Sequence, residues 1–345
     1  MFYAAAQMVR QGKGGELYDL AAQRAFQARY TPYPGLVFNY PPFTAALYIP
    51  TTYTSWKFGY LLWCVANMLA LAGVATILRA RRGPLSAPAN FYGFALLFGP
   101  ALFTLIQGQT SILVLLAFAA ALAMLWQRRP LLAGILLSLA LIKPQLALPM
   151  FAVAVLQGKW KIVGGWLLGA AGFLIASVAI SGWRVLAEYP RFLRTMESLP
   201  STGIKPAYMA SLRALYVYAR GSEPKLWVLA VITLSALLLA SRFSLESDRG
   251  FALSILVTVM VAYHLFPHDL VLLLIPLTIL IEQVEPARWS TALFAGLWLA
   301  PLLVVVFYPP AIPLLAVEML GLLAWTLRLE TRARHPVIAG SSVMS

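Results

Sequence analysis

The sequence predicts an all-α polytopic membrane protein. Hydrophobic residues make up 61% of the 345 residues and charged residues 11%, and the mean hydropathy is +0.79. An ordinary soluble domain is about 45 to 50% apolar and about 25% charged. The apolar residues are gathered into segments that match the thickness of a bilayer when they form helices. We therefore expect a bundle of membrane helices.

The charge pattern favours the same class. The net charge of +14 could suit a nucleic-acid-binding protein, but the Lys and Arg residues lie in short clusters at the ends of apolar segments rather than along one polar face. Such clusters anchor helices at a membrane surface. The single cysteine, Cys64, excludes an intramolecular disulfide, and we interpret it as a packing residue. We expect no nucleic-acid partner.

About ten spans are expected from a hydropathy window of about 19 residues, shortened where proline interrupts. The spans cover residues 56–78, 91–106, 110–126, 131–156, 162–181, 226–241, 250–263, 269–281, 289–308 and 311–328. The segment 131–156 is broken at Lys143-Pro144 and must count as a pair, out and back, if the loops are to alternate.

Two segments are not membrane-like, and they divide the chain. Residues 1–55 are predicted to form an extracytoplasmic loop with amphipathic helices. Residues 182–225 are predicted to form a second extracytoplasmic loop, rich in arginine and aromatic residues. The first transmembrane bundle would then cover 56–181 and the second 226–328. Residues 329–345 would form a cytoplasmic tail.

The basic loops predict the orientation. If RARR at 79–82 is cytoplasmic, alternation places most short basic loops on that side. The opposite, extracytoplasmic side then receives the unusual polar loops: GQT at 108–110, KPQ at 143–145, residues 182–225, YHLFPHD at 263–269 and FYPP at 307–310.

The same alternation places residues 1–55 outside, before a helix that enters at Trp56. A chain that starts outside needs a signal peptide or a preceding helix, and MFYAAAQMVRQGKGG has the pattern of neither. We therefore expect one further transmembrane helix upstream of Met1 in the native protein.

Five motifs carry a resemblance to a known family. They are FYAAAQMVRQGKGGELYDLAAQ at 2–23, FNYPPF at 38–43, QGQTSILVLL at 107–116, ALIKPQ at 140–145 and HLFPHDLVLL at 264–273. In this order and spacing the chain resembles glycosyltransferase family 87, which is similar to the polyprenyl-phosphate-mannose-dependent mannosyltransferases.

The resemblance implies a GT-C architecture and an enzyme in a cell membrane of the bacterial inner-membrane type. It implies transfer of a hexose, most readily mannose, from a polyprenyl-phosphate sugar to a lipid or glycan acceptor on the extracytoplasmic face, without a cofactor. It also implies inverting chemistry with a general base. The base expected from the family is an Asp in an Asp-Phe pair, which aligns upstream of Met1, and Asp19 does not occupy its position.

Several polar residues suit a lipid-phosphate sugar, which needs cations and hydroxyl-reading groups beside an apolar groove. Lys143 supplies a cation where Pro144 breaks a helix, although it could instead snorkel to the interface. Gln109 and Gln145 suit sugar hydroxyls, although Gln109 could simply cap a turn around Gly108. Tyr40 suits them too, although YPPF could be only a rigid turn.

The stretch 264–269 leaves three interpretations open. His264 and His268 with Asp269 could hold a metal, but Pro267 disfavours the helix that would align them, so no metal is expected. Asp269 could cap the next helix. The third interpretation is a sugar and phosphate site, with His264 as the catalytic candidate at its mouth and with His268 and Asp269 binding substrate.

Two other functions are compatible with the composition. A lipid or solute transporter would also have many helices, but it should show an internal repeat and charges at the midplane of the membrane. A noncatalytic, degenerate homologue would explain directly why the expected Asp is absent.

Overall fold

The computed structural model describes residues 1–32, 36–80, 88–199, 204–281 and 288–334. Among these residues the chain forms helices and turns but no strand, which confirms the all-α prediction. In chain order the helices are α1 (Phe2–Arg10), η1 (Gly14–Glu16), α2 (Leu20–Gln27), α3 (Pro42–Ala46), η2 (Ile49–Tyr53), α4 (Trp56–Arg79), α5 (Pro88–Leu97), α6 (Gly99–Ile106), α7 (Ser111–Trp126), α8 (Pro130–Ser138), η3 (Leu139–Ile142), α9 (Pro144–Leu156), α10 (Trp160–Ser181), α11 (Trp183–Ser198), η5 (Pro206–Tyr208), α12 (Leu212–Arg220), α13 (Leu226–Ser241), α14 (Asp248–Val261), η6 (Pro267–Leu273), α15 (Leu274–Ile281), α16 (Arg288–Phe307), η7 (Pro309–Leu314) and α17 (Leu315–Arg334).

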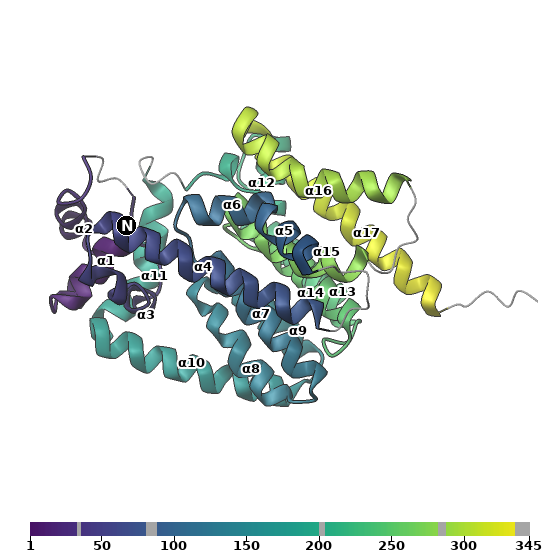
Figure 1. The fold of residues 1–345 in the computed structure, drawn as a ribbon, viewed down its shortest axis with the longest axis horizontal. Coiled ribbons are helices and arrows are strands. Elements are labelled where there is room, and N and C mark those ends of the chain that lie inside the picture. Colours follow the sequence, from purple (N-terminus) through teal and green to yellow (C-terminus); the bar gives the residue numbers. More distant parts are fainter. Residues whose placement is uncertain (33–35, 81–87, 200–203, 282–287, 335–345) are drawn as a thin grey trace, which may run out of the picture.

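The first helices, α1 to α3 with η1 and η2, pack into an N-terminal unit at one end of the molecule (Figure 1). Its core is a small aromatic cluster in which Phe2 stacks on Tyr48 with ring centroids 4.5 Å apart. Tyr48 also stacks on Trp63 of α4 at 3.8 Å. Aromatic pairs of this kind add about 0.5 to 1.5 kcal/mol beyond the area they bury. The N-terminal unit is thereby fixed to the first long helix.

One buried glutamine holds the extended segment that leads to Tyr40. Gln23 of α2 donates from Nε2 to the carbonyl oxygens of Leu17 (2.6 Å) and Phe38 (3.1 Å), and its Oε1 accepts from the Phe38 amide (2.7 Å). The buried backbone of this segment has no helix or sheet partner, so a side chain must satisfy it. Tyr40 is positioned by this arrangement.

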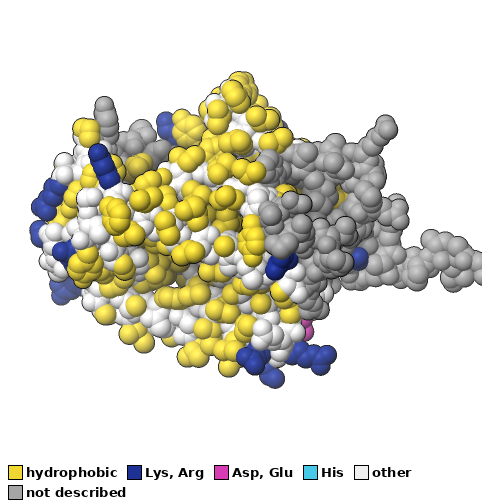
Figure 2. Space-filling view, in the orientation of Figure 1, with side chains coloured by type: hydrophobic (Ala, Val, Ile, Leu, Met, Phe, Trp, Pro, Cys, Tyr) yellow, Lys and Arg dark blue, Asp and Glu magenta, His cyan; other side chains and the backbone are white. Residues whose placement is uncertain are grey.

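Within the described part of the chain, three helices are long and apolar enough to cross a membrane: Trp56–Arg79, Trp160–Ser181 and Pro309–Arg328. Five shorter apolar helices accompany them: Ser111–Trp126, Pro130–Ile142, Pro144–Leu156, Leu226–Ser241 and Pro267–Leu280. On the face shown in Figure 2, hydrophobic side chains cover the middle while many of the Lys and Arg side chains lie toward the two ends. This distribution is that of a membrane protein. Ten crossings remain a prediction.

The loops expected to share one side of the membrane do meet. At one end, Gln157 bonds to the Phe243 carbonyl (2.6 Å) and the Leu245 amide (3.0 Å). At the same end, the Trp126 indole donates to Asp248 (2.6 Å). The starts of α7, α9 and η6 meet at the other end. The polar loops that were expected to lie together are thus in contact, while the alternation across a membrane stays a prediction.

The predicted break at Lys143-Pro144 is present. Helix α8 gives way to η3, Lys143 leaves helical geometry with φ −127° and ψ 85°, and α9 begins at Pro144. Proline has no amide hydrogen and restricts the residue before it, so a helix can start here but not continue through. The Lys143 side chain is thus carried at the start of α9.

Helices α8 and α10 approach very closely. A Cβ atom at Gly165 would lie 2.0 Å from the Leu131 carbonyl oxygen, and one at Gly134 would lie 2.0 Å from that of Ile162. Small residues allow this backbone contact between membrane helices. The close pairing holds α10 against the bundle.

Several helix boundaries differ from the predicted spans and loops. The span 91–106 consists of two helices, α5 and α6, because Pro100 follows Gly99 at the start of a new one. The second loop, 182–225, contains the helices α11 and α12. Helix α17 continues to Arg334, beyond residue 328 where the last span was expected to end, and residues 335–345 lie outside the described residues.

Candidate functional site

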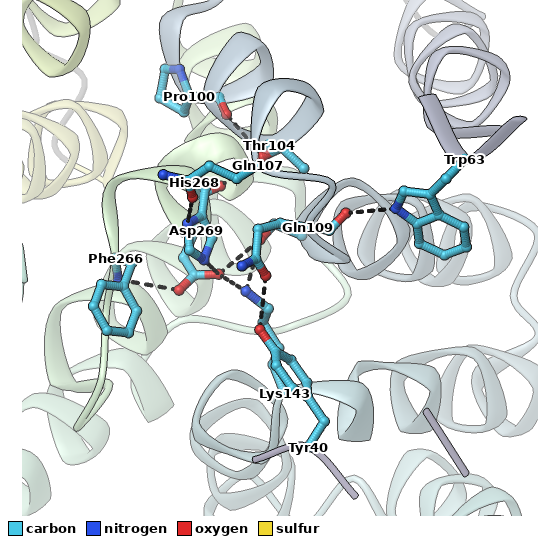
Figure 3. Close-up of polar contacts among 11 residues, drawn as sticks. Tyr40, Trp63, Pro100, Thr104, Gln107, Gln109, Lys143, Phe266, His268 and Asp269 are labelled. Carbon is cyan, nitrogen blue, oxygen red and sulfur yellow. Dashed lines mark hydrogen bonds and ion pairs between the residues drawn. The ribbon is translucent and has the colours of Figure 1, made fainter. Parts of the chain in front are cut away.

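A buried ion pair lies where three helices start (Figure 3). Lys143 Nζ is 2.5 Å from Asp269 Oδ1, and both side chains are almost fully buried, 2% and 0% exposed. Ser111, the first residue of α7, accepts from Lys143 (2.9 Å) and donates to the same Asp269 oxygen (2.8 Å). Two charges can be buried together only when their partners replace the lost water. Lys143 therefore does not snorkel to the interface.

Asp269 takes part in the start of η6, although not as the expected N-cap. Phe266 is the N-cap and Pro267 the first residue of the helix, so Asp269 is the third. Its Oδ2 accepts from the Phe266 amide at 3.2 Å while Oδ1 binds Lys143. The expectation that Asp269 stands just before the helix is corrected to a position inside its first turn, from which it closes back onto the N-cap amide.

His268 is buried beside this pair. Its Nδ1 lies 2.7 Å from Gln107 Oε1, an acceptor, so Nδ1 carries the proton in this amide orientation. Its Nε2 is buried without a hydrogen-bond partner among the described residues and lies 3.7 Å from Asp269 Oδ1. Thr104 donates to the His268 carbonyl at 3.1 Å. We call Lys143, Asp269, Ser111, His268 and Gln107 the Lys143 network.

A second polar pair, Tyr40 with Gln109, adjoins the Lys143 network. Tyr40 Oη donates to Gln109 Oε1 at 2.8 Å, and Lys143 Nζ lies 5.8 Å from the centre of the Tyr40 ring. Gln109 follows Gly108, whose φ of +61° is a conformation that glycine adopts readily. The turn at Gly108 points the side chains of Gln107 and Gln109 toward different partners. The N-terminal unit thus contributes a side chain to the same site as α7, α9 and η6.

Gln145 and His264 are not part of the Lys143 network. Gln145 is half-buried near the start of α9, and its side chain forms no hydrogen bond among the described residues. His264 instead lies 2.6 Å from Glu197 Oε1 through its Nε2. The residues that the sequence predicts to share one site therefore lie in separate groups.

His264 belongs to a partly exposed group that we call the His264 cluster: His264, Glu197, Arg213, Tyr263 and Glu223. Arg213 forms a two-point pair with Glu223 (2.9 and 3.0 Å), stacks 3.9 Å from the centre of the Tyr263 ring and lies 3.7 Å from Glu197. Tyr263 Oη donates to Glu197 at 3.4 Å.

Burial raises the pKa of Glu197, but the hydrogen bond and charge of His264, the Arg213 guanidinium and the Tyr263 hydroxyl outweigh it and hold that pKa below its usual value.

Sequence reasoning did not identify Ser111 or Glu197 as site residues. Ser111 had a signal, since it follows Gln109 in the motif QGQTS. Glu197 had none, because its partner His264 is 67 residues away. Among the described residues, no group of three or more His, Cys, Asp and Glu side chains could hold a metal ion.

Chemically, the site combines a neutral buried ion pair, a histidine with a free lone pair and an amide paired to a phenol. These groups bind hydroxyls well because each supplies a fixed donor or acceptor away from water. The hydrophobic core of the helical bundle lies next to these groups. The arrangement therefore suits a polyhydroxylated ligand at the end of a hydrophobic bundle.

The comparisons with known proteins agree with this description. No curated protein and no solved structure matches the chain. The family model of glycosyltransferase family 87 matches residues 38–267, about two thirds of the chain. The matched region includes Tyr40, Gln109 and Lys143, whereas the resembling segment 2–23 lies before it. The chain belongs to glycosyltransferase family 87, a family of membrane glycosyltransferases.

Proposed function

We propose that this glycosyltransferase transfers a hexose, with mannose as the first candidate, from a polyprenyl-phosphate donor to a lipid or glycan acceptor. The observation that carries the proposal is the Lys143 network with Tyr40 and Gln109, a buried polar site at the end of an apolar bundle. A lipid-linked sugar needs both surroundings at once, since its tail stays in the bilayer while its sugar meets polar groups.

Two unfilled positions in the Lys143 network suit a sugar hydroxyl. Lys143 uses two of its three ammonium hydrogens, on Ser111 and Asp269, and His268 Nε2 has no partner among the described residues. A hydroxyl can accept from the first and donate to the second. Tyr40 and Gln109 supply a neighbouring donor and acceptor. Asp269 balances the charge of Lys143, so this lysine acts on the sugar rather than as a free cation for phosphate.

His264 is proposed as the catalytic group at the extracytoplasmic mouth of the site. His264 Nε2 donates to Glu197 Oε1 at 2.6 Å, and a carboxylate placed in this way orients a histidine that moves a proton. Gln145 is proposed to contact the acceptor, because it is half-buried and its amide is unoccupied among the described residues.

The test uses the full chain in proteoliposomes with labelled polyprenyl-phosphate mannose, glucose and galactose, and with a nucleotide sugar as comparison. Transfer of label from one polyprenyl-phosphate hexose to lipid or glycan is the expected result. Transfer from the nucleotide sugar alone would contradict the donor class. Donor binding without any transfer would favour the noncatalytic alternative, and movement of unreacted donor across the bilayer would favour a transporter.

The side of the membrane is tested separately. In a Cys64→Ser background, a single cysteine at exposed Lys205 should react with an impermeant thiol reagent from outside the cell, and one at exposed Lys161 should not. The reverse labelling would place the site on the cytoplasmic face.

A further inference from the structure

The outer face of α11 carries three arginines that the proposed chemistry does not use. Arg184, Arg191 and Arg194 border one open hollow together with Trp183, Ala187, Glu188 and Pro190. The spacing of three to seven residues places the arginines on one side of the helix. Among the described residues none of the three side chains has a hydrogen-bond or ion-pair partner, and all three residues are exposed.

The opposite face of α11 is fixed to the protein. Phe192 stacks on Tyr18 of the N-terminal unit at 4.7 Å between ring centroids, and Tyr189 donates to the Asn39 carbonyl at 3.0 Å. Glu197 binds His264 near the end of the helix. The arginine face is therefore held outward, and its exposure follows from the packing of the helix.

Exposed apolar side chains of α10 precede the arginine face along the chain. On α10, Ile175 is 70% exposed and Leu174 48%, and Trp183, just beyond the end of that helix, is 64% exposed. Helix α10 is long and apolar enough to span a membrane, and α11 runs across its direction at that end (Figure 1). An exposed tryptophan at the end of an apolar helix marks the level of the lipid headgroups.

Three guanidinium groups with one carboxylate, Glu188, give this face an excess of two positive charges. Guanidinium groups bind phosphate through paired hydrogen bonds, and basic residues at a membrane surface attract anionic lipids. A ligand that fits both neighbouring surfaces must carry hydrocarbon chains for α10 and an anionic phosphate for α11.

We propose that the arginine face of α11 binds the phosphate headgroup of an anionic phospholipid whose acyl chains lie against α10. This lipid is distinct from the sugar donor. It would hold α11 in the plane of the membrane surface, with the inner face of the helix against the N-terminal unit and His264.

Site-specific photo-cross-linking tests this proposal. The full chain carries benzoylphenylalanine in place of Ala187, inside the hollow, and is reconstituted in phosphatidylcholine with or without phosphatidylglycerol. We expect an adduct with the mass of phosphatidylglycerol. Because each basic residue at a membrane surface contributes about 1 kcal/mol, Arg184→Gln/Arg191→Gln/Arg194→Gln should reduce cross-linking at least about tenfold.

A matched triple variant, Arg129→Gln/Lys161→Gln/Arg242→Gln, removes three exposed charges at the other end of the molecule and should leave the adduct unchanged. Equal adducts with both lipids, or an adduct that the arginine substitutions do not reduce, would overturn the proposal. It would also fail if added inorganic phosphate abolished the adduct, or if added polyprenyl phosphate replaced phosphatidylglycerol in it.

Discussion

The Lys143 network and the His264 cluster are both built on a carboxylate with a cationic partner, but they differ in burial. Lys143 and Asp269 are 2% and 0% exposed, whereas His264 and Glu197 are 23% and 28% exposed. Water can replace a lost partner in the His264 cluster and cannot do so in the Lys143 network. Removing one charged partner should therefore mainly lower stability in the Lys143 network and mainly lower activity in the His264 cluster.

Lys143→Met should have the largest effect on stability. It leaves the Asp269 carboxylate buried without its cation, which should lower the free energy of unfolding by about 3 to 5 kcal/mol. The double variant Lys143→Met/Asp269→Leu should recover most of that loss, because no charge is left. Chemical unfolding of the purified protein in detergent measures both values.

Lys159→Met provides the matched control, because Lys159 pairs with Glu246 at 2.8 Å in a more exposed place. Its cost should be about 0 to 1 kcal/mol. If Lys143→Met costs no more than this control, the ion pair is not buried as described.

Tyr40→Phe tests the polar pair beside the Lys143 network. Without the hydroxyl, Gln109 Oε1 loses its donor, so the variant should be about 1 to 2 kcal/mol less stable and should bind donor more weakly. Tyr3→Phe is the control, since Tyr3 makes a comparable bond of 2.7 Å to the Thr54 carbonyl away from the site. Donor affinity that is equally low in both variants would remove Tyr40 from the sugar site.

Glu197→Gln tests the His264 cluster. It should cost about 1 kcal/mol or less, because the group is partly exposed, and yet it should reduce turnover about tenfold or more if His264 moves a proton. Full turnover in Glu197→Gln would show that the cluster is structural.

The lowered pKa of Glu197 also predicts how the stability difference between the wild type and Glu197→Gln depends on pH. Since that pKa is lower in the folded protein than its usual value of 4.5, the charged carboxylate adds stability above about pH 4.5 that is lost as the pH falls through the folded value. The stability difference between the wild type and Glu197→Gln should stay constant above about pH 4.5 and should shrink as the pH falls below that value. A difference that grows on acidification would contradict the assigned direction.

Gln145→Ala should have the smallest effect on stability, within about 0.5 kcal/mol, since its side chain makes no hydrogen bond among the described residues. A change in the acceptor KM without a change in donor affinity would support its proposed contact with the acceptor. Unchanged kinetics for both substrates would remove Gln145 from the site.

The fold class, most of the apolar helices and the break at Lys143-Pro144 could be predicted from the sequence. These features depend on local properties: apolar composition over a helix length, basic residues at helix ends, and the missing amide hydrogen of proline. The same local pattern placed the polar loops 108–110, 143–145 and 263–269 together, because alternating segments return a chain to the same end.

Which of the polar residues touch depends on the packing of distant helices. Lys143 and Asp269 are 126 residues apart, and Tyr40 and Gln109 are 69 apart, so no spacing rule pairs them. His264 and His268 are four residues apart, but Pro267 starts η6 between them and sends them to different partners. Local sequence decides where a polar side chain enters a bundle, while burial and the packing of distant helices decide which charges must neutralise one another.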